Sequence, residues 1–483
     1  MGTPDAVVVG SGPNGLAAAL VLARAGLGVE VFEGAAVAGG GCRTAELTLP
    51  GFHHDVCSTV QSMAPLSPFF LDLDLERLGV ELLRPEVAFA HPLGNDRAGA
   101  VFASLSDTAD ALGPDGARYT RLFGPLVEAA ATIVPTVLAP LRSPPRDPVA
   151  MARFGLAGVP SVAHLVRRFE TDETKGLLAG VAGHAMLPLD APLTAAFAIF
   201  LTITAHAGGW PLVKGGSARL VDVLLSELTS MGGTVQTGRF VKDLAELPAA
   251  RAILFDTSLE TLLAVAGREL PARYRSAAAR FRHGPGVCKV DWALSGPVPW
   301  TAAVCRRAGT LHLGGSFEEV AQSEGDVAAG RHAVRPYCLV VQPGVADPTR
   351  APAGQETLWA YCHVPTGSTV DMTERIEAQV ERFAPGFRDL VLARSTMTAM
   401  DGEVHNPNCV GGDISGGAGT LRQTIFRPTM RWNPYRTGAP GIYLCSASTP
   451  PGGGVHGMCG VGAARAALAD LKRSRGRMGV PRA

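Results

Sequence analysis

Residues 6–15 of the chain read A-V-V-V-G-S-G-P-N-G, an apolar run that passes directly into a glycine-rich turn. The next ten residues, 16–25, are mostly apolar and helix-forming, and a second apolar run at 29–32 is followed by Glu33. Strand, glycine turn, helix, strand and acidic residue in this order are typical of a βαβ dinucleotide-binding unit. The complete pattern is more specific than the three glycines alone, because glycine-rich turns are common. It predicts a Rossmann-type dinucleotide site, with a purely structural βαβ turn as the alternative.

Each part of this turn has a physical task in such a site. Gly10 permits the tight turn, Gly12 allows the backbone to approach a pyrophosphate, and Gly15 allows helix and strand to pack closely. The amide groups at the start of the helix then face the phosphates. Glu33 can accept hydrogen bonds from the adenosine ribose, and its charge repels a 2′-phosphate. The predicted cofactor contacts of this unit are Gly10, Gly12, Pro13, Asn14, Gly15 and Glu33.

Length and composition narrow the class of protein. The chain has 483 residues, which is enough for two or three domains of ordinary size. Hydrophobic residues make up 47% and charged residues 18%, which indicates a globular enzyme rather than a disordered protein. Lys+Arg and Asp+Glu both number 43, so nothing indicates nucleic acid as a partner. The nine cysteines show neither C-x-x-C pairs nor zinc spacing, so we expect reduced thiols in a cytosolic protein and no metal site.

The apolar stretches are too short to predict a membrane span. The longest ones, 195–205 and 129–141, fall short of the roughly 18 uncharged residues that a spanning helix needs. The chain enters its first strand almost at once, without the pattern of a secretory signal. We therefore expect a cytoplasmic protein, with peripheral contact to a membrane as a further option.

The α/β pattern of the first unit returns in the middle of the chain and at its end. Residues 70–210 are mostly helical in pattern, and 284–365 are rich in alternating β segments. A discontinuous domain of this kind favours FAD over NAD, because FAD has to be held at both ends. We predict a Rossmann-type FAD-binding domain from 1–70, 212–270 and 430–483, and a substrate domain with a mixed β-sheet and helices from 71–211 and 271–429.

Four motifs together resemble the phytoene desaturase-like FAD-dependent oxidoreductases. They are the glycine turn with its distant acid, G-G-G-C-R-T at 39–44, L-V-K-G-G-S at 212–217 and Y-L-C-S-A-S-T-P-P-G-G-G-V-H-G at 443–457. Two further segments, G-P-G-V-C-K-V-D-W-A-L at 284–294 and G-G-D-I-S-G-G at 411–417, are similar to the branch named pyridine nucleotide-disulfide oxidoreductase domain-containing protein 2. The resemblance runs essentially end to end. It implies FAD and a fold that combines α/β and α+β parts, of the glutathione-reductase or amine-oxidase type, more strongly than it implies the reaction.

The resemblance also implies where FAD is held. The turn at 39–44 would line the pyrophosphate and ribityl chain, although the family often has an arginine where this chain has Gly41. Glycines 452–454 would let the backbone approach the isoalloxazine ring, and a helix expected from near Val455 would direct its amide groups at the pyrimidine edge. Amine-oxidase relatives typically carry an acid at the position of Ala447, so this departure favours the desaturase branch. The further predicted contacts are Gly39, Gly40, Gly41, Arg43, Thr44, Val241, Ser446, Ala447, Gly453, Gly454 and Val455.

Three side chains are candidates for proton transfer or oxygen activation. His456 should pass beside the flavin, and His54 lies in a turn that the family places near the active-site side. A neutral histidine can shuttle a proton near neutral pH. Lys214 is similar to the lysine that some flavin oxidases use to activate oxygen. A structural role is the alternative for each. No histidine or cysteine lies in a recognised flavinylation motif, so we expect non-covalent FAD.

The apolar character of 125–141 and 181–213 predicts a dry cavity that reaches the flavin, with a floor near 287–294. Trp210, Trp292 and Trp300 would line it or pack in the core. The first hypothesis is hydride transfer from a largely apolar, polyene- or lipid-like small molecule to flavin N5, with oxygen or a quinone as final acceptor. The alternatives are a redox-neutral double-bond isomerase or saturase, an amine oxidase, and a non-catalytic flavin-holding partner protein. A second nucleotide fingerprint is absent from the sequence, so we expect no NAD(P)H site, and the oligomeric state stays open, with a homodimer as one option.

Overall fold

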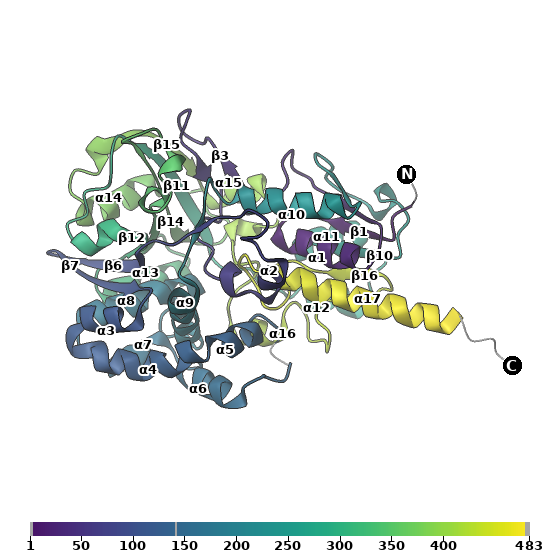
Figure 1. Ribbon diagram of the computed structural model, residues 1–483, viewed down its shortest axis with the longest axis horizontal. Helices are drawn as coiled ribbons and strands as arrows, with labels where there is room; N and C mark the ends of the chain where they lie inside the picture. The colour runs from purple at the N-terminus through teal and green to yellow at the C-terminus, as the bar shows by residue number, and fades with distance from the viewer. Residues whose placement is uncertain (1–2, 141–142, 479–483) are drawn as a thin grey trace.

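A parallel sheet is assembled from three separate stretches of the chain. Residues 3–140 and 143–478 are described in this computed structural model (Figure 1). The strands lie in the order β16-β10-β1-β2-β9, and every neighbouring pair is parallel. Apolar runs suit these strands, because a parallel sheet is buried on both faces. The bounds are Ala6–Val9 for β1, Val29–Phe32 for β2, Thr234–Gln236 for β9, Ala252–Phe255 for β10 and Ile442–Leu444 for β16.

Helix α1 (Pro13–Arg24) begins inside the glycine turn, three residues before the predicted range. Proline is well suited to the first helical position, since its fixed φ matches the helix and the N–H that it lacks would have no helical partner there. The sequence pattern located the helix by its apolar residues and therefore missed this first turn.

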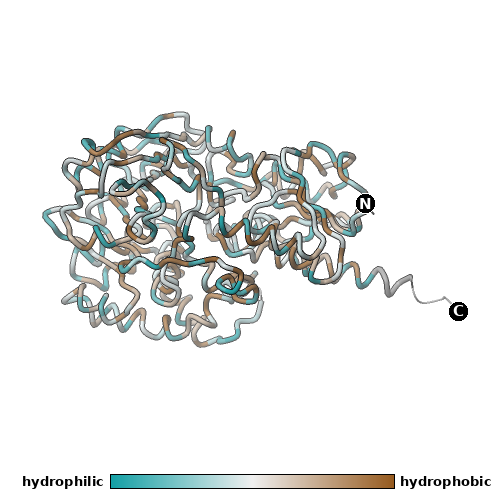
Figure 2. The backbone as a smooth tube through the Cα atoms, turned by 45° about the horizontal axis from the view of Figure 1, so that its top comes forward, coloured by the Kyte–Doolittle hydropathy of each residue, from teal (hydrophilic) through white to brown (hydrophobic). Residues whose placement is uncertain are grey.

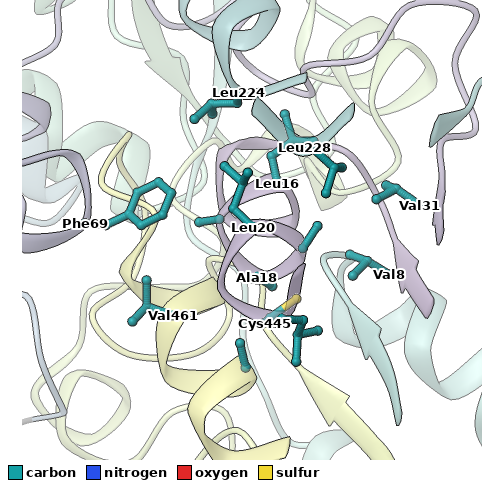
Figure 3. Close-up of a cluster of buried hydrophobic side chains, with 14 of the residues drawn as sticks. Val8, Leu16, Ala18, Leu20, Val31, Phe69, Leu224, Leu228, Cys445 and Val461 are labelled. Carbon is teal, nitrogen blue, oxygen red and sulfur yellow. The ribbon is translucent and has the colours of Figure 1, made fainter. Parts of the chain in front are cut away.

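The side chains of α1 fill the space between the sheet and two other helices, α10 (Ala218–Ser230) and α17 (Met458–Met478). Figure 3 shows this cluster around α1, and its labelled members are Val8, Leu16, Ala18, Leu20, Val31, Phe69, Leu224, Leu228, Cys445 and Val461. A Cβ added to Gly460 of α17 would lie 1.9 Å from the carbonyl oxygen of Asn14. The first and last helices therefore pack backbone against backbone.

The second large sheet is mixed, with strand order β15-β11-β14-β13-β12-β6-β7. Its neighbouring strands are antiparallel except for β12 and β6, which are parallel. The bounds are Val87–Gly94 for β6, Arg97–Phe102 for β7, Gly286–Leu294 for β11, Ala308–Leu313 for β12, Cys338–Val341 for β13, Glu356–Val364 for β14 and Val391–Met397 for β15. Two small pairs, β3 (Thr44–Ala45) with β4 (His54–Asp55) and β5 (Leu82–Leu83) with β8 (Leu212–Val213), lie outside both large sheets.

A bundle of helices packs beside the mixed sheet, at the lower left of Figure 1. At its centre lies α9 (Thr194–Gly208), which contacts most of the surrounding helices. The others are α3 (Leu105–Ala111), α4 (Gly116–Glu128), α5 (Ala130–Val137), α6 (Pro148–Gly158), α7 (Val162–Leu165) and α8 (Asp172–Ala182). The remaining helices are α2 (Pro68–Leu73), α11 (Leu259–Ala266), α12 (Ala272–Ala278), α13 (Phe317–Ala328), α14 (Thr373–Phe383), α15 (Ala399–His405) and α16 (Leu421–Phe426). The predicted fold class is confirmed, while the exact domain boundaries stay a prediction.

Hydrophobic segments are spread through both parts of the molecule (Figure 2). Within the described ranges, no single helix combines the length and the apolar composition needed to cross a membrane. The pair Pro148–Gly158 and Val162–Arg168, bent by 92°, meets these two measures only when its members are taken together.

Candidate functional site

One large cavity joins the two parts of the molecule. Its volume is about 930 Å³, near the upper end of the range for small-molecule and cofactor sites. One end is lined by the carboxyl edge of the parallel sheet and its glycine turns, and the other by the helical bundle and the mixed sheet. A cavity at this edge of a parallel sheet is where dinucleotides bind in such folds.

The three glycines of the first turn stand where a side chain would collide with its neighbours. Gly10 has a φ of +101°, and a Cβ added there would lie 2.6 Å from the carbonyl oxygen of Asp256. An added Cβ on Gly12 would lie 2.8 Å from Oδ2 of Asp256, and one on Gly15 would lie 2.1 Å from the oxygen of Gly10. Gly10, Gly12, Pro13 and Asn14 line the cavity, whereas Gly15 lies behind them and donates its N–H to Asp256.

Glu33 lies at the end of β2 and lines the same end of the cavity. Its Oε2 accepts hydrogen bonds from the backbone N–H and the hydroxyl of Ser11, at 3.0 and 2.5 Å, and its Oε1 accepts from the N–H of Ala35 at 2.8 Å. These bonds hold the carboxylate beside the glycine turn. A carboxylate offers about four lone-pair sites, so an adenosine ribose could still be bound there.

Asp256, at the end of β10, also lines this part of the cavity and was missed by the sequence reasoning. Burial raises the pKa of its carboxyl to about 7; the Gly15 N–H opposes this rise, and the charge of Glu33 adds to it. The missed signal was an acid directly after a buried parallel strand, as with Glu33 after β2. The carboxyl ends of parallel strands share one edge of the sheet, so both acids meet at the same place.

The second glycine turn packs directly onto the first. An added Cβ on Gly40 would lie 3.0 Å from the Cα of Gly12, and Gly39 donates its N–H to the Ser11 hydroxyl at 3.2 Å. Gly40, Gly41 and Arg43 line the cavity. Thr44 does not, because its hydroxyl donates to Asp55 at 2.7 Å. Gly39 and Thr44 thus support the turn from outside the cavity.

The C-terminal motif lines the cavity through Ser446, Ala447, Gly453, Gly454 and Val455, and Val241 lines it from another side, while their contacts with FAD stay a prediction. The helix that follows begins at Met458 rather than near Val455. Gly452, Gly454 and Gly457 have φ values of +120°, +125° and +69°, which are left-handed and keep the segment out of a helix.

His456 also lines the cavity, yet both of its ring nitrogens are used by its own segment. Nδ1 accepts a hydrogen bond from the N–H of Met458 at 3.0 Å, and Nε2 donates to the carbonyl of Gly452 at 3.1 Å. Burial lowers the pKa of this imidazole to about 4. The ring therefore braces the glycine-rich turn as a neutral side chain, and the geometry gives no support for proton transfer by it.

The other two catalytic candidates, His54 and Lys214, do not line this cavity. His54 is buried beside the hydroxyl of Thr48, 2.8 Å from its Nε2. Burial, followed by the charge of a nearby lysine, lowers the pKa of His54 to about 3. Lys214 is half-exposed and pairs with Glu81 at 2.8 Å. These positions give no support for a role of either residue at the reacting atoms.

The lysine that is buried next to the site is Lys289 on β11. Its ammonium group contacts the carboxylate of Asp291 and lies 5.2 Å from the ring centre of Trp359. It lines a second cavity of about 60 Å³, which also borders Gly40 and Gly41. The sequence contained a signal for this buried pair: Lys289 and Asp291 stand at alternate positions of an otherwise apolar strand and therefore share one face of it.

Arg427 is a second missed cation, buried beside the C-terminal motif. Its guanidinium donates to the carbonyl oxygens of Ala447 and Gly417 at 3.1 and 3.0 Å, and its Nε has no partner. Oδ1 of Asn14, near the other glycine turn, is likewise buried without a partner. Both residues line the cavity, so a polar cofactor would find an unused donor and an unused acceptor there.

The far end of the cavity is an apolar chamber. Its helical wall comes from the predicted stretches and from α6, which was not predicted to take part. Its floor comes from β12, β13 and β14 rather than from the predicted segment 287–294, because β11 lies farther along the sheet and faces the small cavity. Trp210 lines the chamber, whereas Trp292 and Trp300 pack in the core. The helical wall includes Val137, Leu138, Met151, Phe154, Val159, Leu193, Phe197, Phe200, Leu201 and Trp210, and the floor includes Thr310, Leu339, Val341, Trp359 and Tyr361.

Comparison with known proteins also indicates a dinucleotide-binding fold. Residues 8–66 match the model of the NAD(P)-binding Rossmann-like domain. The mouse pyridine nucleotide-disulfide oxidoreductase domain-containing protein 2 is 27% identical, over 97% of this chain and 94% of that protein. A 4,4′-diapolycopen-4-al dehydrogenase of Metabacillus indicus is 26% identical over 56% of this chain and 55% of that protein. Among solved structures, cyclohexylamine oxidase of Brevibacterium oxydans superposes with a TM-score of 0.60 at 17% identity, covering 98% of this chain and 100% of that one.

The predicted resemblance is confirmed. The fold is shared with oxidoreductases of the amine-oxidase type, and the relatives support an oxidoreductase. The site fits FAD: the glycine turns leave room for a close approach to the backbone, Glu33 lines the same end, and Asn14 and Arg427, which each hold a buried polar atom without a partner, line the cavity. These observations together support FAD as the cofactor, and its non-covalent binding stays a prediction.

Proposed function

We propose that this protein is an FAD-dependent oxidoreductase that removes hydride from a largely apolar small molecule. The observation that carries the proposal is the continuity of the cavity. A single cavity runs from the carboxyl edge of the parallel sheet into the apolar chamber. A substrate in the chamber would therefore lie against a cofactor held at the other end.

The chain's own residues would bind the cofactor, orient the substrate and exclude water. Bound FAD would supply a hydride acceptor, with oxygen or a quinone taking the electrons afterwards. The two glycine turns, Arg43 and Arg427 would hold the cofactor, and the apolar wall would fix the substrate in a dry site. Hydride transfer from carbon depends on orientation and on exclusion of water, so it does not require a strong acid or base in the chamber.

The position of the carboxylates favours an uncharged substrate over an amine. Among the described residues that line the cavity, the carboxylates are Glu33, Asp256 and Asp413. The first two lie at the dinucleotide end, and Asp413 accepts hydrogen bonds from the N–H groups of Gly284, Ser415 and Gly417. An ammonium group in the chamber would thus lack a free anionic partner. The chamber also argues against a protein that only holds flavin.

The direct test is anaerobic mixing of the yellow holoprotein with candidate substrates while the oxidised flavin band is followed. We expect bleaching by a largely apolar, unsaturated compound such as geraniol, and none by cyclohexylamine. Product without net bleaching would indicate the redox-neutral isomerase or saturase. Bleaching by the amine alone would overturn the proposal in favour of an amine oxidase.

Two glycine variants separate the chamber from general effects on the fold. Gly155 of α6 lines the chamber, and an added Cβ there would meet no atom within 4 Å. Gly325 of α13 is also helical with open space around it, but it lines neither cavity. Gly155→Leu should slow bleaching by the apolar substrate at unchanged FAD content, whereas Gly325→Leu should leave it unchanged.

A further inference from the structure

One polar side chain interrupts the helical wall of the apolar chamber. Of the described cavity-lining residues between 137 and 210, only His184 and Trp210 carry a side-chain nitrogen or oxygen. The indole N–H of Trp210 is used, because it donates to the carbonyl of Leu201 at 3.1 Å and lies 3.2 Å from the hydroxyl of Thr204. His184 lies edge-on to this indole, with ring centres 5.7 Å apart. It is therefore the free polar group of this wall.

His184 is held from behind by a second histidine. Its Nε2 lies 2.9 Å from Nε2 of His312 on β12, and the two rings are nearly perpendicular at 87°. His312 is completely buried and stacks on Tyr337 at an interplanar angle of 15°. Burial lowers the pKa of His184 to about 3 and that of His312 well below its ordinary value. Both rings are thus neutral near pH 7.

A hydrogen bond between two neutral imidazoles needs one N–H donor and one bare acceptor nitrogen. Nδ1 of His312 is buried and has no partner. A buried N–H without a partner is rarer than an unsatisfied acceptor, so the proton of His312 belongs on Nε2, where it is used. His312 then donates to Nε2 of His184. The proton of His184 must be on Nδ1, which has no protein partner among the described residues and is not enclosed by protein atoms.

A second unused polar group stands on the floor of the same chamber. Thr310 lines the cavity and is only 2% exposed, and its hydroxyl is buried without a hydrogen-bond partner. Thr310 and His312 are two positions apart on β12, so their side chains lie on the same face of the sheet. Thr310 therefore lies beside His312, the residue that holds His184.

We propose that His184 and Thr310 form a binding site for a single uncharged oxygen of the substrate. This inference rests on the proposed function and narrows it: the substrate is an apolar molecule that carries one hydroxyl or carbonyl group. Nδ1–H of His184 donates to that oxygen, and Thr310 either donates a second bond to a carbonyl or accepts the proton of an alcohol. His312 is the positioning residue that fixes the proton of His184 on the cavity side.

The chemistry of this site selects against charged groups. Neutral imidazole and hydroxyl supply no net charge to balance a carboxylate, and burying an unpaired ion in an apolar site is expensive. An ammonium group has donors only, so it cannot accept the hydrogen bond from His184. A hydroxyl or carbonyl satisfies both groups of the protein at once.

The test compares matched probes of one shape in the holoprotein. Nile red is displaced from the chamber by 1-methylnaphthalene, 1-naphthalenemethanol, 1-naphthaldehyde or 1-naphthylmethylamine, and each dissociation constant is measured. The hydrocarbon serves as the internal reference for apolar burial. Thr310→Val and His184→Leu should each weaken the alcohol and the aldehyde about three- to tenfold relative to the hydrocarbon, the scale of one hydrogen bond.

The controls separate a binding role from a structural one. Thr357 is also a buried threonine whose hydroxyl has no partner, yet it lines neither cavity, so Thr357→Val should change no ratio. His184→Asn keeps an N–H donor near the position of Nδ1 and should recover part of the preference. If His184→Leu fails to fold, the nearly isosteric Thr310→Val still decides the question.

Two results would overturn the inference in different ways. If Thr310→Val and His184→Leu weaken the alcohol and the hydrocarbon by the same factor, the polar site has no role, while the apolar chamber and the proposed function stand. If Nile red does not bind, or no probe displaces it, both the chamber and its polar site are wrong. A loss confined to the amine would replace the uncharged oxygen with a cationic group.

Discussion

The two ends of the large cavity are built by different means. At the dinucleotide end, backbone and glycines from short local motifs define the surface, and a Cβ on Gly10, Gly12 or Gly15 would collide with neighbouring atoms. At the chamber end, side chains from α5, α6, α9 and three strands of the mixed sheet define it, and no local motif joins them. The shape of the dinucleotide end thus depends on positions where only glycine fits, and that of the chamber end depends on the packing of side chains from distant segments.

The two ends should therefore respond differently to substitution. A close backbone approach tolerates no added atom, so the dinucleotide end should fail abruptly. The chamber has open space beside Gly155 and should change by degrees. Function in this fold can therefore diverge at the chamber while the cofactor end stays the same.

The largest effect is expected at Gly15. An added Cβ would lie 2.1 Å from a backbone oxygen, which cannot move aside as a flexible side chain can. Gly15→Ala should lower the free energy of unfolding by about 3 kcal/mol, the upper end of overpacking costs, and should abolish FAD retention. Gly28→Ala is the control, because its Cβ would meet no atom closer than 3.8 Å. Denaturant unfolding and flavin absorbance measure both effects, and a stable, yellow Gly15→Ala protein would refute the steric account.

The next effect is expected at Glu33. Glu33→Ala should weaken FAD binding by on the order of 1–3 kcal/mol, the scale of charge-assisted hydrogen bonds. Glu30 lies on β2, the strand that Glu33 follows, but outside the cavity, where it accepts a hydrogen bond from Gln236, so Glu30→Ala should leave binding unchanged. FAD occupancy after dialysis provides the comparison. Equal retention by both variants would remove Glu33 from the adenosine site.

The same contrast explains what could be predicted from the sequence. The glycine turns and Glu33 could be found because their roles depend on neighbours within one βαβ unit. Asp256 and Arg427 could not, since their positions depend on which distant segments meet at the sheet edge. The start of α17 at Met458 could not be predicted either, because it depends on the left-handed conformations of Gly452, Gly454 and Gly457.

The catalytic candidates show most clearly what could not be predicted from the sequence. Lys214 was a candidate because it is similar to the lysine that some flavin oxidases use to activate oxygen, but the buried lysine beside the glycine turn is Lys289, which looks like an ordinary strand residue in the sequence. His456 lines the cavity, yet only the structure shows that both of its ring nitrogens are hydrogen-bonded within its own segment. The role inferred for His184 likewise depends on His312, which lies 128 residues away in the chain.

A smaller effect is expected from the titration of Asp256. The folded protein holds its carboxyl pKa at about 7, above the ordinary value of 3.8. Between these two values the folded state binds more protons than the unfolded state, so this group's contribution to stability is full below the lower pKa and is lost as pH rises through about 7. The slope should reach at most about 1.4 kcal/mol per pH unit in the FAD-free protein. Asp256→Asn should flatten the profile of unfolding free energy measured from pH 5 to pH 8, and an unchanged slope would contradict the assignment.

The smallest effect is expected from pH at the chamber end, where the preference among bound probes should not change at all. The folded pKa of His184 lies at about 3, mainly because of burial and then because of the charge of His363. His184 and His312 therefore stay neutral from about pH 5 to pH 8, where an ordinary histidine would change its charge. Acid should lower the stability of the fold, because the unfolded imidazole gains a proton near its ordinary pKa of 6.5 while the folded one does not. The ratio of the affinities for 1-naphthalenemethanol and 1-methylnaphthalene should nevertheless stay constant across this range. A ratio that changes around pH 6.5 would show that His184 titrates in the folded protein, and with it the neutral donor geometry at the chamber would be wrong.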